Sequence, residues 1–432
     1  MTPADSTIVA VSGHRRWDSR GRPTVEVLVQ TGAGRGRAIA PAGASTGSGE
    51  ALDRRDGGTR FGGLGVEDAV ETVNALIGPA LVGLDADDQA ACDAAMELLD
   101  GSAQFERLGG NAVVATSLAV AHAAAAAAGV PLWQHLGPGA TVLPLPEIQI
   151  FGGGAHAHRR LDLQDLMIVP HGAGSFAEAL EWTADVYRAA GRQLGQRGAL
   201  GGVADEGGWW PEFATNAHAI EALVEAIEGA GLTPGRDVSI SIDVAATQLF
   251  DQGRYHLRLE NASYDRPGWC RLVLSWLDAF PIVSIEDPCA ETDDEGMATI
   301  VAAAGNRQIV GDDFLVTDAA RIAASAAAGT TTAALIKPNQ AGTLTRARGA
   351  LDAAHRCRLS TIVSARSGES EDVSVAHLAV GWGSGGVKVG SITRGERTAK
   401  WNELLRIEES IGSAATFAGI SGLAPPSAGP TP

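Results

Sequence analysis

Cysteine pairs, a signal-peptide segment and an excess of positive charge are all missing from this sequence. Its four cysteines lie far apart and form no CxxC pair. We therefore expect neither a disulfide framework nor a zinc site, and a reducing compartment fits better. The first thirty residues carry charges throughout and so contain no signal-peptide core. These absences predict a cytoplasmic protein.

The charge balance narrows the range of partners. Aspartate and glutamate outnumber lysine and arginine by 51 to 33, which gives a net charge of −18. Because phosphate backbones bind basic surfaces, a nucleic acid polymer is not expected as a partner. A small anionic substrate would need metal ions and a local cluster of Lys and Arg side chains.

Long apolar runs are also scarce. The most apolar stretch, residues 113–130, is mostly alanine and is interrupted by Thr116, Ser117 and His122. Its length allows a membrane span, but its composition favours a buried, closely packed helix, so we expect no membrane association.

The chain of 432 residues is too long for one ordinary core. Residues 23–30 alternate between apolar and polar side chains, a glycine-rich turn follows, and residues 35–40 return as a second strand. Helical patterns then dominate from about residue 66 to residue 129. Strands followed by helices predict an α+β domain over residues 1–135.

Short β-branched runs alternate with alanine-rich helical stretches in the rest of the chain. After the first pair, these runs end at intervals of about 25 residues, the length of one βα unit. The series predicts an α/β fold with a closed parallel (β/α)8 barrel over residues 136–420; an open doubly wound sheet is the alternative. Residues 421–432 are rich in Pro, Ser and Ala and are predicted to be a disordered tail. The predicted strands are residues 238–243, 282–286, 308–312, 333–337, 361–365 and 386–389.

The ends of these strands carry the candidate chemistry. Asp243, Glu286 and Asp312 end successive strands, and the C-terminal strand ends of a barrel meet at its active site. Such carboxylates cannot all stay ionised without a cation between them, and hard oxygen ligands beside an anionic substrate suit Mg²⁺. The alternative is that each acid only caps the helix that follows it.

Two lysines follow in the same series. Lys337 ends an apolar run, where burial among other cations disfavours its ammonium form, so it is a candidate general base. Lys388 is placed to hold a substrate carboxylate and to stabilise the charge that develops as a proton leaves carbon. Either lysine could instead be a salt-bridge partner of the acids.

Three loops complete the candidate site. Residues 205–208 read Asp-Glu-Gly-Gly; burial would raise the pKa of one of these carboxyl groups and let it donate a proton. A plain acidic turn is the alternative. Residues 43–47 and 152–156 are glycine-rich and suit mobile lids over a phosphorylated ligand.

Together these segments resemble the enolase family from about residue 18 to residue 409. Residues 18–27 resemble the family's opening DSRGNPTVEV, residues 43–47 its first catalytic loop, and residues 205–208 its DEGG motif. The resemblance implies an enolase-like N-terminal α+β domain, a modified eight-stranded TIM-type barrel, and a homodimer or higher homo-oligomer. Further matches follow in family order at residues 284–288, 311–313, 337–340, 366–369 and 400–409.

The resemblance also implies two Mg²⁺ ions. Asp243, Glu286 and Asp312 would hold a structural ion, and Ser45 would help to hold a second ion linked to the substrate. The substrate would be a small anionic phosphorylated or phosphonate compound.

The same resemblance gives the other site residues their roles. Lys337 would remove the proton at C2, and Glu206 would protonate the leaving 3-hydroxyl. The remaining residues would surround the substrate: Lys388 facing its carboxylate, Arg366 and Ser367 facing its phosphate, His156 closing over it, and Gln164 and Asp165 lining the site.

The sequence departs from the family near the phosphorus end of the ligand. Ala365 stands where enolases have an active-site histidine, and the loop usually read as SHAGN is Ala-His-Ala-His-Arg at residues 155–159. Alanine opens space and Arg159 adds an anion contact, which suits a ligand larger or more anionic at phosphorus than 2-phosphoglycerate. Random drift is the alternative. The other departures are Asp165 for glutamate, Ala42 for serine, and Trp209 and Trp210 for Phe-Ala.

Among enolase relatives, the carboxyphosphonoenolpyruvate synthases of phosphinothricin-type antibiotic pathways fit this pattern. They handle an activated phosphonoformate together with a phosphoglycerate-type three-carbon unit. The leading hypothesis is therefore a Mg²⁺-dependent enzyme that abstracts the C2 proton, eliminates the 3-hydroxyl and forms an enolpyruvyl product in phosphonate biosynthesis. The alternatives are a glycolytic enolase, which converts 2-phosphoglycerate to phosphoenolpyruvate, and a non-catalytic enolase-fold binding protein.

Overall fold

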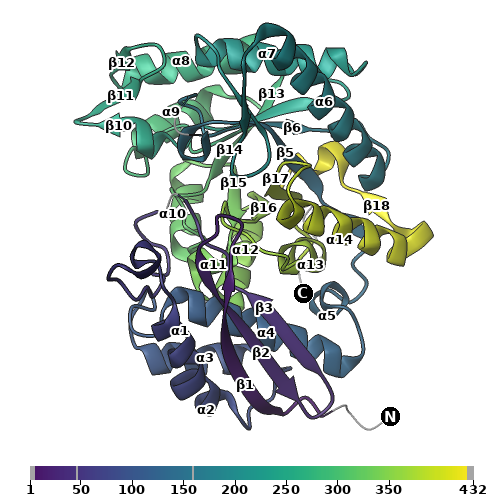
Figure 1. Ribbon diagram of the computed structural model, residues 1–432. Helices are drawn as coiled ribbons and strands as arrows, with labels where there is room; N and C mark the ends of the chain where they lie inside the picture. The colour runs from purple at the N-terminus through teal and green to yellow at the C-terminus, as the bar shows by residue number, and fades with distance from the viewer. Residues whose placement is uncertain (1–4, 45–46, 158–159, 426–432) are drawn as a thin grey trace.

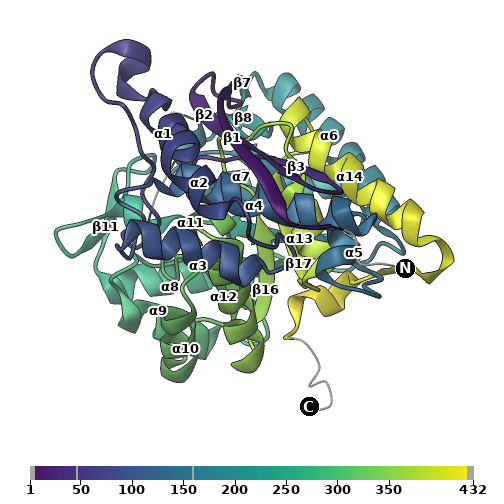
Figure 2. The same ribbon diagram turned by 90° about the horizontal axis from the view of Figure 1, so that it is seen from below.

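A computed structural model describes residues 5–44, 47–157 and 160–425, except for the side chain of His156. The N-terminal part is a three-stranded antiparallel sheet with helices, and the rest of the chain forms a barrel (Figure 1). Seen from below, the N-terminal sheet and helices lie in front of the barrel (Figure 2).

The N-terminal sheet has the strand order β1-β2-β3. Two of its strands, β2 (Pro23–Thr31) and β3 (Arg35–Ile39), are the predicted pair, which is confirmed. The first strand, β1 (Ile8–Trp17), was not predicted. Its sequence, IVAVSGHRRW, is an apolar run followed by a mostly polar one, so it has no period of two by which to find it.

Helix α4 (Gly110–Ala128) forms the core of the N-terminal part. Sheet strands β2 and β3 cover it on one side, and barrel helices α11 (Pro338–Ala341) and α12 (Leu344–Arg356) also contact it. Among the described residues it is the one helix long and apolar enough to cross a membrane, and 83% of that stretch is buried inside the protein. The predicted buried helix is confirmed. The smaller helices around it are α1 (Glu67–Thr72), α2 (Gly78–Leu81), α3 (Gln89–Asp100) and α5 (Leu132–Leu136).

Eight strands form a ring, because β17 pairs with β5 as well as with β16. The closed barrel is confirmed, and the open doubly wound sheet is wrong. The ring is not fully parallel, since β6 runs antiparallel to both of its neighbours. No α-helix is described between β5 and β6, and a parallel pair needs a longer crossover. The strands are β5 (Leu145–Gly152), β6 (Asp165–Val169), β9 (Ser239–Asp243), β13 (Ile282–Glu286), β14 (Gln308–Gly311), β15 (Ala333–Ile336), β16 (Ser360–Ser364) and β17 (Gly386–Gly390).

Helices surround the barrel, and a short hairpin of β7 (Leu200–Val203) and β8 (Trp209–Pro211) extends its sheet at β5. A separate small sheet joins β10 (Phe250–Asp251), β11 (Arg254–Leu257) and β12 (Ala262–Tyr264), and β4 (Val142–Leu143) pairs with β18 (Thr416–Phe417). The other barrel helices are α6 (Phe176–Arg197), α7 (Asn216–Gly229), α8 (Arg266–Ala279), α9 (Asp294–Ala303), α10 (Ala319–Ala328), α13 (Ser374–Gly381) and α14 (Gly395–Ile411).

The predicted tail, residues 421–432, begins inside a 3-10 helix, Gly419–Leu423. Gly422 is buried against the backbone of Gly385, and the side-chain amide of Gln308 donates a hydrogen bond to Leu423 O at 3.0 Å. Residues 421–423 are therefore packed helix rather than tail, because a glycine allows close backbone contact there. Residues 426–432 lie outside the described part of the chain.

Close packing of β3 on α4 generates a stability prediction. A Cβ added at Gly36 would overlap the backbone of Ala119 and Ala123, whereas a Cβ at Gly349 in α12 would meet nothing within 4 Å. Gly36→Ala is expected to lower the free energy of unfolding by about 2–3 kcal/mol. Gly349→Ala, the control, is expected to raise it by about 0.5–1 kcal/mol because alanine is the better helix former. Urea unfolding measures both, and equal effects of the two changes would contradict the packing argument.

Candidate active site

Three acids lie side by side at the mouth of the barrel. Asp165 pairs in register with Asp243, and Asp243 with Glu286. Asp165 begins β6, while the other two end β9 and β13. Because β6 runs in the opposite direction, its first residue lies where its neighbours finish. All three carboxylates are buried.

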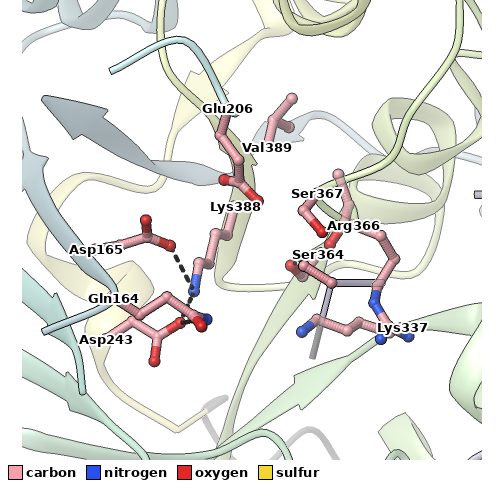
Figure 3. Close-up of a pocket in the computed structure, with 12 residues that line it drawn as sticks. Gln164, Asp165, Glu206, Asp243, Lys337, Ser364, Arg366, Ser367, Lys388 and Val389 are labelled. Carbon is pink, nitrogen blue, oxygen red and sulfur yellow. Dashed lines mark hydrogen bonds and ion pairs between the residues drawn. The ribbon is translucent and has the colours of Figure 1, made fainter. Parts of the chain in front are cut away.

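Two lysine ammonium groups compensate these and neighbouring acids. Lys388 Nζ lies 2.9 Å from Asp243 Oδ2 and 3.9 Å from Asp165 Oδ2 (Figure 3). It also lies 2.7 Å from Glu286 Oε2. Lys337 forms an ion pair with Asp312. Both lysines therefore do act as salt-bridge partners, as the alternative interpretation held, and both also face the same pocket.

Burial and mutual repulsion control the ionisation of this cluster. Burial raises the pKa of Glu286 well above its usual value, and the charge of Asp243 adds to this effect. Burial also opposes ionisation of Asp312, but Lys337 and Arg366 outweigh it and hold the Asp312 pKa at about 2. The barrel mouth thus contains carboxyl groups whose charge depends on nearby cations.

The prediction that the surroundings of Lys337 disfavour its ammonium form is wrong for this arrangement. Burial and Arg366 disfavour its ammonium form, as predicted, but the neighbouring Asp312 outweighs them and raises the Lys337 pKa. The sequence could not show that the two side chains touch. A cation that competed for Asp312 would remove the main interaction that keeps Lys337 protonated.

The acids that end the strands do not cap helices. The N-caps of α8, α9 and α10 are Asp265, Asp293 and Asp318, whose side chains accept hydrogen bonds from the first helical turns. The helix-capping alternative is therefore wrong for Asp243 and Glu286, which end β9 and β13, and for Asp312, which directly follows β14.

The oxygen atoms at the barrel mouth fit a hard divalent cation. Glu286 Oε1 is buried and has no hydrogen-bond partner among the described residues, which is costly unless a ligand satisfies it. A tighter acidic group is also present: oxygens of Asp287, Asp312 and Asp313 lie within 4.8 Å of one another. Asp287, however, accepts the backbone N–H groups of Asp312 and Asp313 at 2.9 and 2.8 Å. Its carboxylate thus braces that loop, which leaves Glu286 as the better ligand.

The segment after β16 forms one end of the pocket, which we call the anion end because it carries the Arg366 guanidinium. Arg366 lines the pocket and donates hydrogen bonds to both oxygens of Glu50, at 2.8 and 3.2 Å. Glu50 also accepts the backbone N–H of Gly47 at 3.0 Å, so it joins the 43–47 loop to the strand end. Sequence reasoning missed Glu50, which lies just outside the glycine-rich motif and has no signal of its own.

The acidic loop places one carboxyl group inside and one outside. Glu206 is buried and lines the pocket, whereas the Asp205 side chain is 42% exposed. Tyr187 OH donates to Gly207 O at 2.9 Å, and Gly208 N–H donates to Gln149 Oε1 at 2.8 Å, so the loop backbone is held firmly. A plain acidic turn would not bury Glu206.

Most predicted site residues meet in one pocket, where Glu206 and Lys337 approach from different sides (Figure 3). Its free volume is only about 20 Å³, room for roughly one water, so a substrate must displace the ion pairs that cross it. Ser45, Arg159 and the His156 side chain lie outside the described residues. The pocket is lined by Ala44, Gln164, Asp165, Glu206, Asp243, Lys337, Ser364, Ala365, Arg366, Ser367, Lys388 and Val389.

Of the departures from the family pattern, Ala365 lines the pocket, whereas the two tryptophans pack outside it. Ala365 lines the pocket and also a second cavity of about 30 Å³ behind it. Trp209 instead stacks on Tyr187, with ring centroids 4.6 Å apart, and Trp210 lies under the guanidinium of Arg160. Neither tryptophan lines the pocket, so their size affects packing and not the ligand.

Lysine usage is a signal that the sequence contains and that was missed. The chain has only three lysines, Lys337, Lys388 and Lys400, and the structure buries all of them. Two face the pocket, and the third donates to Glu369 Oε2 at 2.9 Å behind the anion end. All the other positions with a Lys or Arg residue carry arginine, so each lysine in this sequence indicates a buried charged site.

Comparison with protein families agrees with this geometry. Residues 8–136 match the sequence model of the enolase N-terminal domain, and residues 140–425 match that of the enolase C-terminal TIM barrel domain. The two matches together cover nearly the whole chain, and the second includes every strand of the barrel. This protein therefore belongs to the enolase family.

Proposed function

We propose that this protein is a Mg²⁺-dependent enolase-type lyase that acts on a three-carbon phosphate or phosphonate. Membership in the enolase family supports the lyase class. The observation that carries the proposal is the pocket itself, which gathers two buried lysines, the buried Glu206 and two buried aspartates around one small space. A binding protein without catalysis would not need an acid and a base on different sides of its ligand.

The positions of Lys337 and Glu206 on different sides of the pocket support the following reaction. Lys337, deprotonated, takes the proton from C2 of the substrate, and the electron pair moves toward the carboxylate. Lys388 stabilises the charge that develops there. Glu206 then gives its proton to the 3-hydroxyl as the C3–O bond breaks, so that water leaves and the enolpyruvyl double bond forms.

The acids of the barrel mouth are proposed to hold the metal. Asp243, Glu286 and Asp312 would supply the oxygen ligands. A cation bound there would also remove the free-energy cost of burying Glu286 Oε1 without a hydrogen-bond partner. A bound Mg²⁺ would supply positive charge beside the substrate carboxylate, where negative charge develops as the proton leaves.

The specialised role is proposed from the phosphorus end. A histidine in place of Ala365 would extend toward the pocket or the cavity behind it, and alanine leaves both spaces free. This supports a substrate with an added group on phosphorus, and thus a carboxyphosphonoenolpyruvate synthase of phosphonate antibiotic biosynthesis. The other candidate is phosphopyruvate hydratase, which the same base and acid would serve.

The roles of base and acid predict different defects. Lys337→Met should lower exchange of the C2 proton of 2-phosphoglycerate with D₂O by roughly 10³-fold or more, because it removes the amine proposed to take that proton. Glu206→Gln keeps the shape of the acid but not its proton, so exchange should continue while elimination falls by a similar factor. Proton NMR follows exchange, and absorbance of the enolpyruvyl product follows elimination. Normal exchange in Lys337→Met would show that another group is the base.

The phosphorus end predicts substrate choice. Wild-type protein with Mg²⁺ is incubated with 2-phosphoglycerate, with and without nucleotide-activated phosphonoformate, and is followed by phosphorus NMR. We expect a new carboxyphosphono product only in the complete mixture. Ala365→His should slow its formation by roughly tenfold or more, because the imidazole fills the space for the added group. Rapid phosphoenolpyruvate formation from 2-phosphoglycerate alone would instead identify a glycolytic enolase, and no turnover in either mixture would favour a binding protein.

A further inference from the structure

Arg20 reaches from the N-terminal domain to the anion end of the pocket. It lies in the turn between β1 and β2, where Asp18 Oδ1 accepts the backbone N–H groups of Arg20 and Arg22 at 2.9 and 2.8 Å. In the same turn, Ser19 N–H donates to Glu369 O at 2.7 Å. The turn is thus fixed against the barrel segment that follows β16.

The guanidinium of Arg20 joins two segments of the site. It donates a hydrogen bond to Ser367 Oγ, and longer ones to Ala42 O at 3.3 Å and Gly43 O at 3.5 Å. Ala42 and Gly368 also exchange two backbone hydrogen bonds of 2.8 Å. Arg20 therefore lies across the point where the start of the 43–47 loop meets the anion end.

The positive charge of Arg20 is weakly compensated. Its side chain is 9% exposed, and its ion pair with the half-exposed Asp205 is long, at 3.8 Å. Its Nε–H is buried without a hydrogen-bond acceptor among the described residues. By contrast, Arg366 contacts both oxygens of buried Glu50. Burial and the nearby Arg22 lower the Arg20 pKa, and the carboxylates of Asp205, Asp18 and Glu206 only partly offset this effect.

The contact with Ser367 has a direct chemical consequence. A hydroxyl oxygen that accepts a hydrogen bond from a guanidinium keeps its own hydrogen for another acceptor. Ser367 lines the pocket, and no described residue accepts a hydrogen bond from its hydroxyl. Its O–H is therefore available to an anion in the pocket, and the adjacent guanidinium makes it a stronger donor.

We propose that Arg20 is a positioning residue for the anion end: it orients the Ser367 hydroxyl toward the phosphorus group of the substrate and holds the backbone of Ala42 and Gly43 beside it. The inference rests on the proposed function in placing the phosphorus group at Ser367. It adds a residue of the N-terminal domain that acts through Ser367.

A double-mutant cycle on anion binding tests this role. The dissociation constants of inorganic phosphate and of phosphonoformate are measured calorimetrically, with Mg²⁺ present, for wild type, Arg20→Gln, Ser367→Ala and the double variant. We expect each single change to weaken binding roughly tenfold or more. The double variant should bind about as weakly as the weaker single variant, because both changes remove one shared interaction.

Two further variants separate positioning from folding. Arg22→Gln removes an exposed charge from the same turn and should leave both dissociation constants unchanged. Arg20→Lys keeps the charge but lacks the planar set of donors, so it should recover only part of the affinity. With a substrate that turns over, Arg20→Gln should raise KM more than it lowers kcat.

Additive losses in the double variant, or an equal loss in Arg22→Gln, would overturn the inference. So would a wild-type protein that binds neither anion. Because these measurements need no turnover, they are independent of the reaction test. A chain that shows the coupling but forms no enolpyruvyl product would refute the proposed reaction and keep the role of Arg20. If Arg20→Gln fails to fold, Arg20→Lys with Ser367→Ala gives the same cycle.

Discussion

The contact of Lys388 with Asp243 and Glu286 is the interaction on which the barrel mouth depends. Three buried acids on adjacent strands would repel one another and lose the solvation of water. One ammonium group within 3 Å of two of them offsets that cost. The same ion pairs link cation binding to the state of the lysines, since any divalent cation that binds must compete with a lysine for the carboxylates. Each lysine released in this way becomes available to the substrate. The atoms that compensate the buried charges are thus the ones to which the proposed function assigns the chemistry.

The closed ring of strands is what brings these charges together. Lys388 on β17 and Asp243 on β9 are far apart in the sequence and are not on neighbouring strands. They meet only because the side chains at the strand ends converge across the barrel. The reversed direction of β6 adds Asp165 to the same row, at a position where a parallel strand would have placed its opposite end.

The N-terminal domain supplies contacts that the barrel lacks. Glu50 holds Arg366, and Arg20 holds Ser367, so both residues at the anion end are oriented from outside the barrel. A site divided between two domains in this way can change its ligand preference at one end while Lys337 and Glu206, which the barrel holds, keep their positions. The small side chain at Ala365 lies at that variable end.

The sequence by itself determined the type of fold and most of the candidate site. Hydrophobic period and strand spacing predicted the barrel, since they record local structure directly, and the motifs placed eight of the pocket's residues. It did not reveal β1, the direction of β6, the roles of Glu50 and Arg20, or the ion pair that raises the Lys337 pKa. Each of these depends on which side chains meet after the chain has folded, and side chains hundreds of positions apart, such as Arg20 and Ser367, leave no common pattern in the sequence. The identities of the charged groups were therefore set by the sequence. Their partners, and with them their protonation and orientation, were decided only by the tertiary structure, because Coulomb and hydrogen-bond energies depend on distance in space.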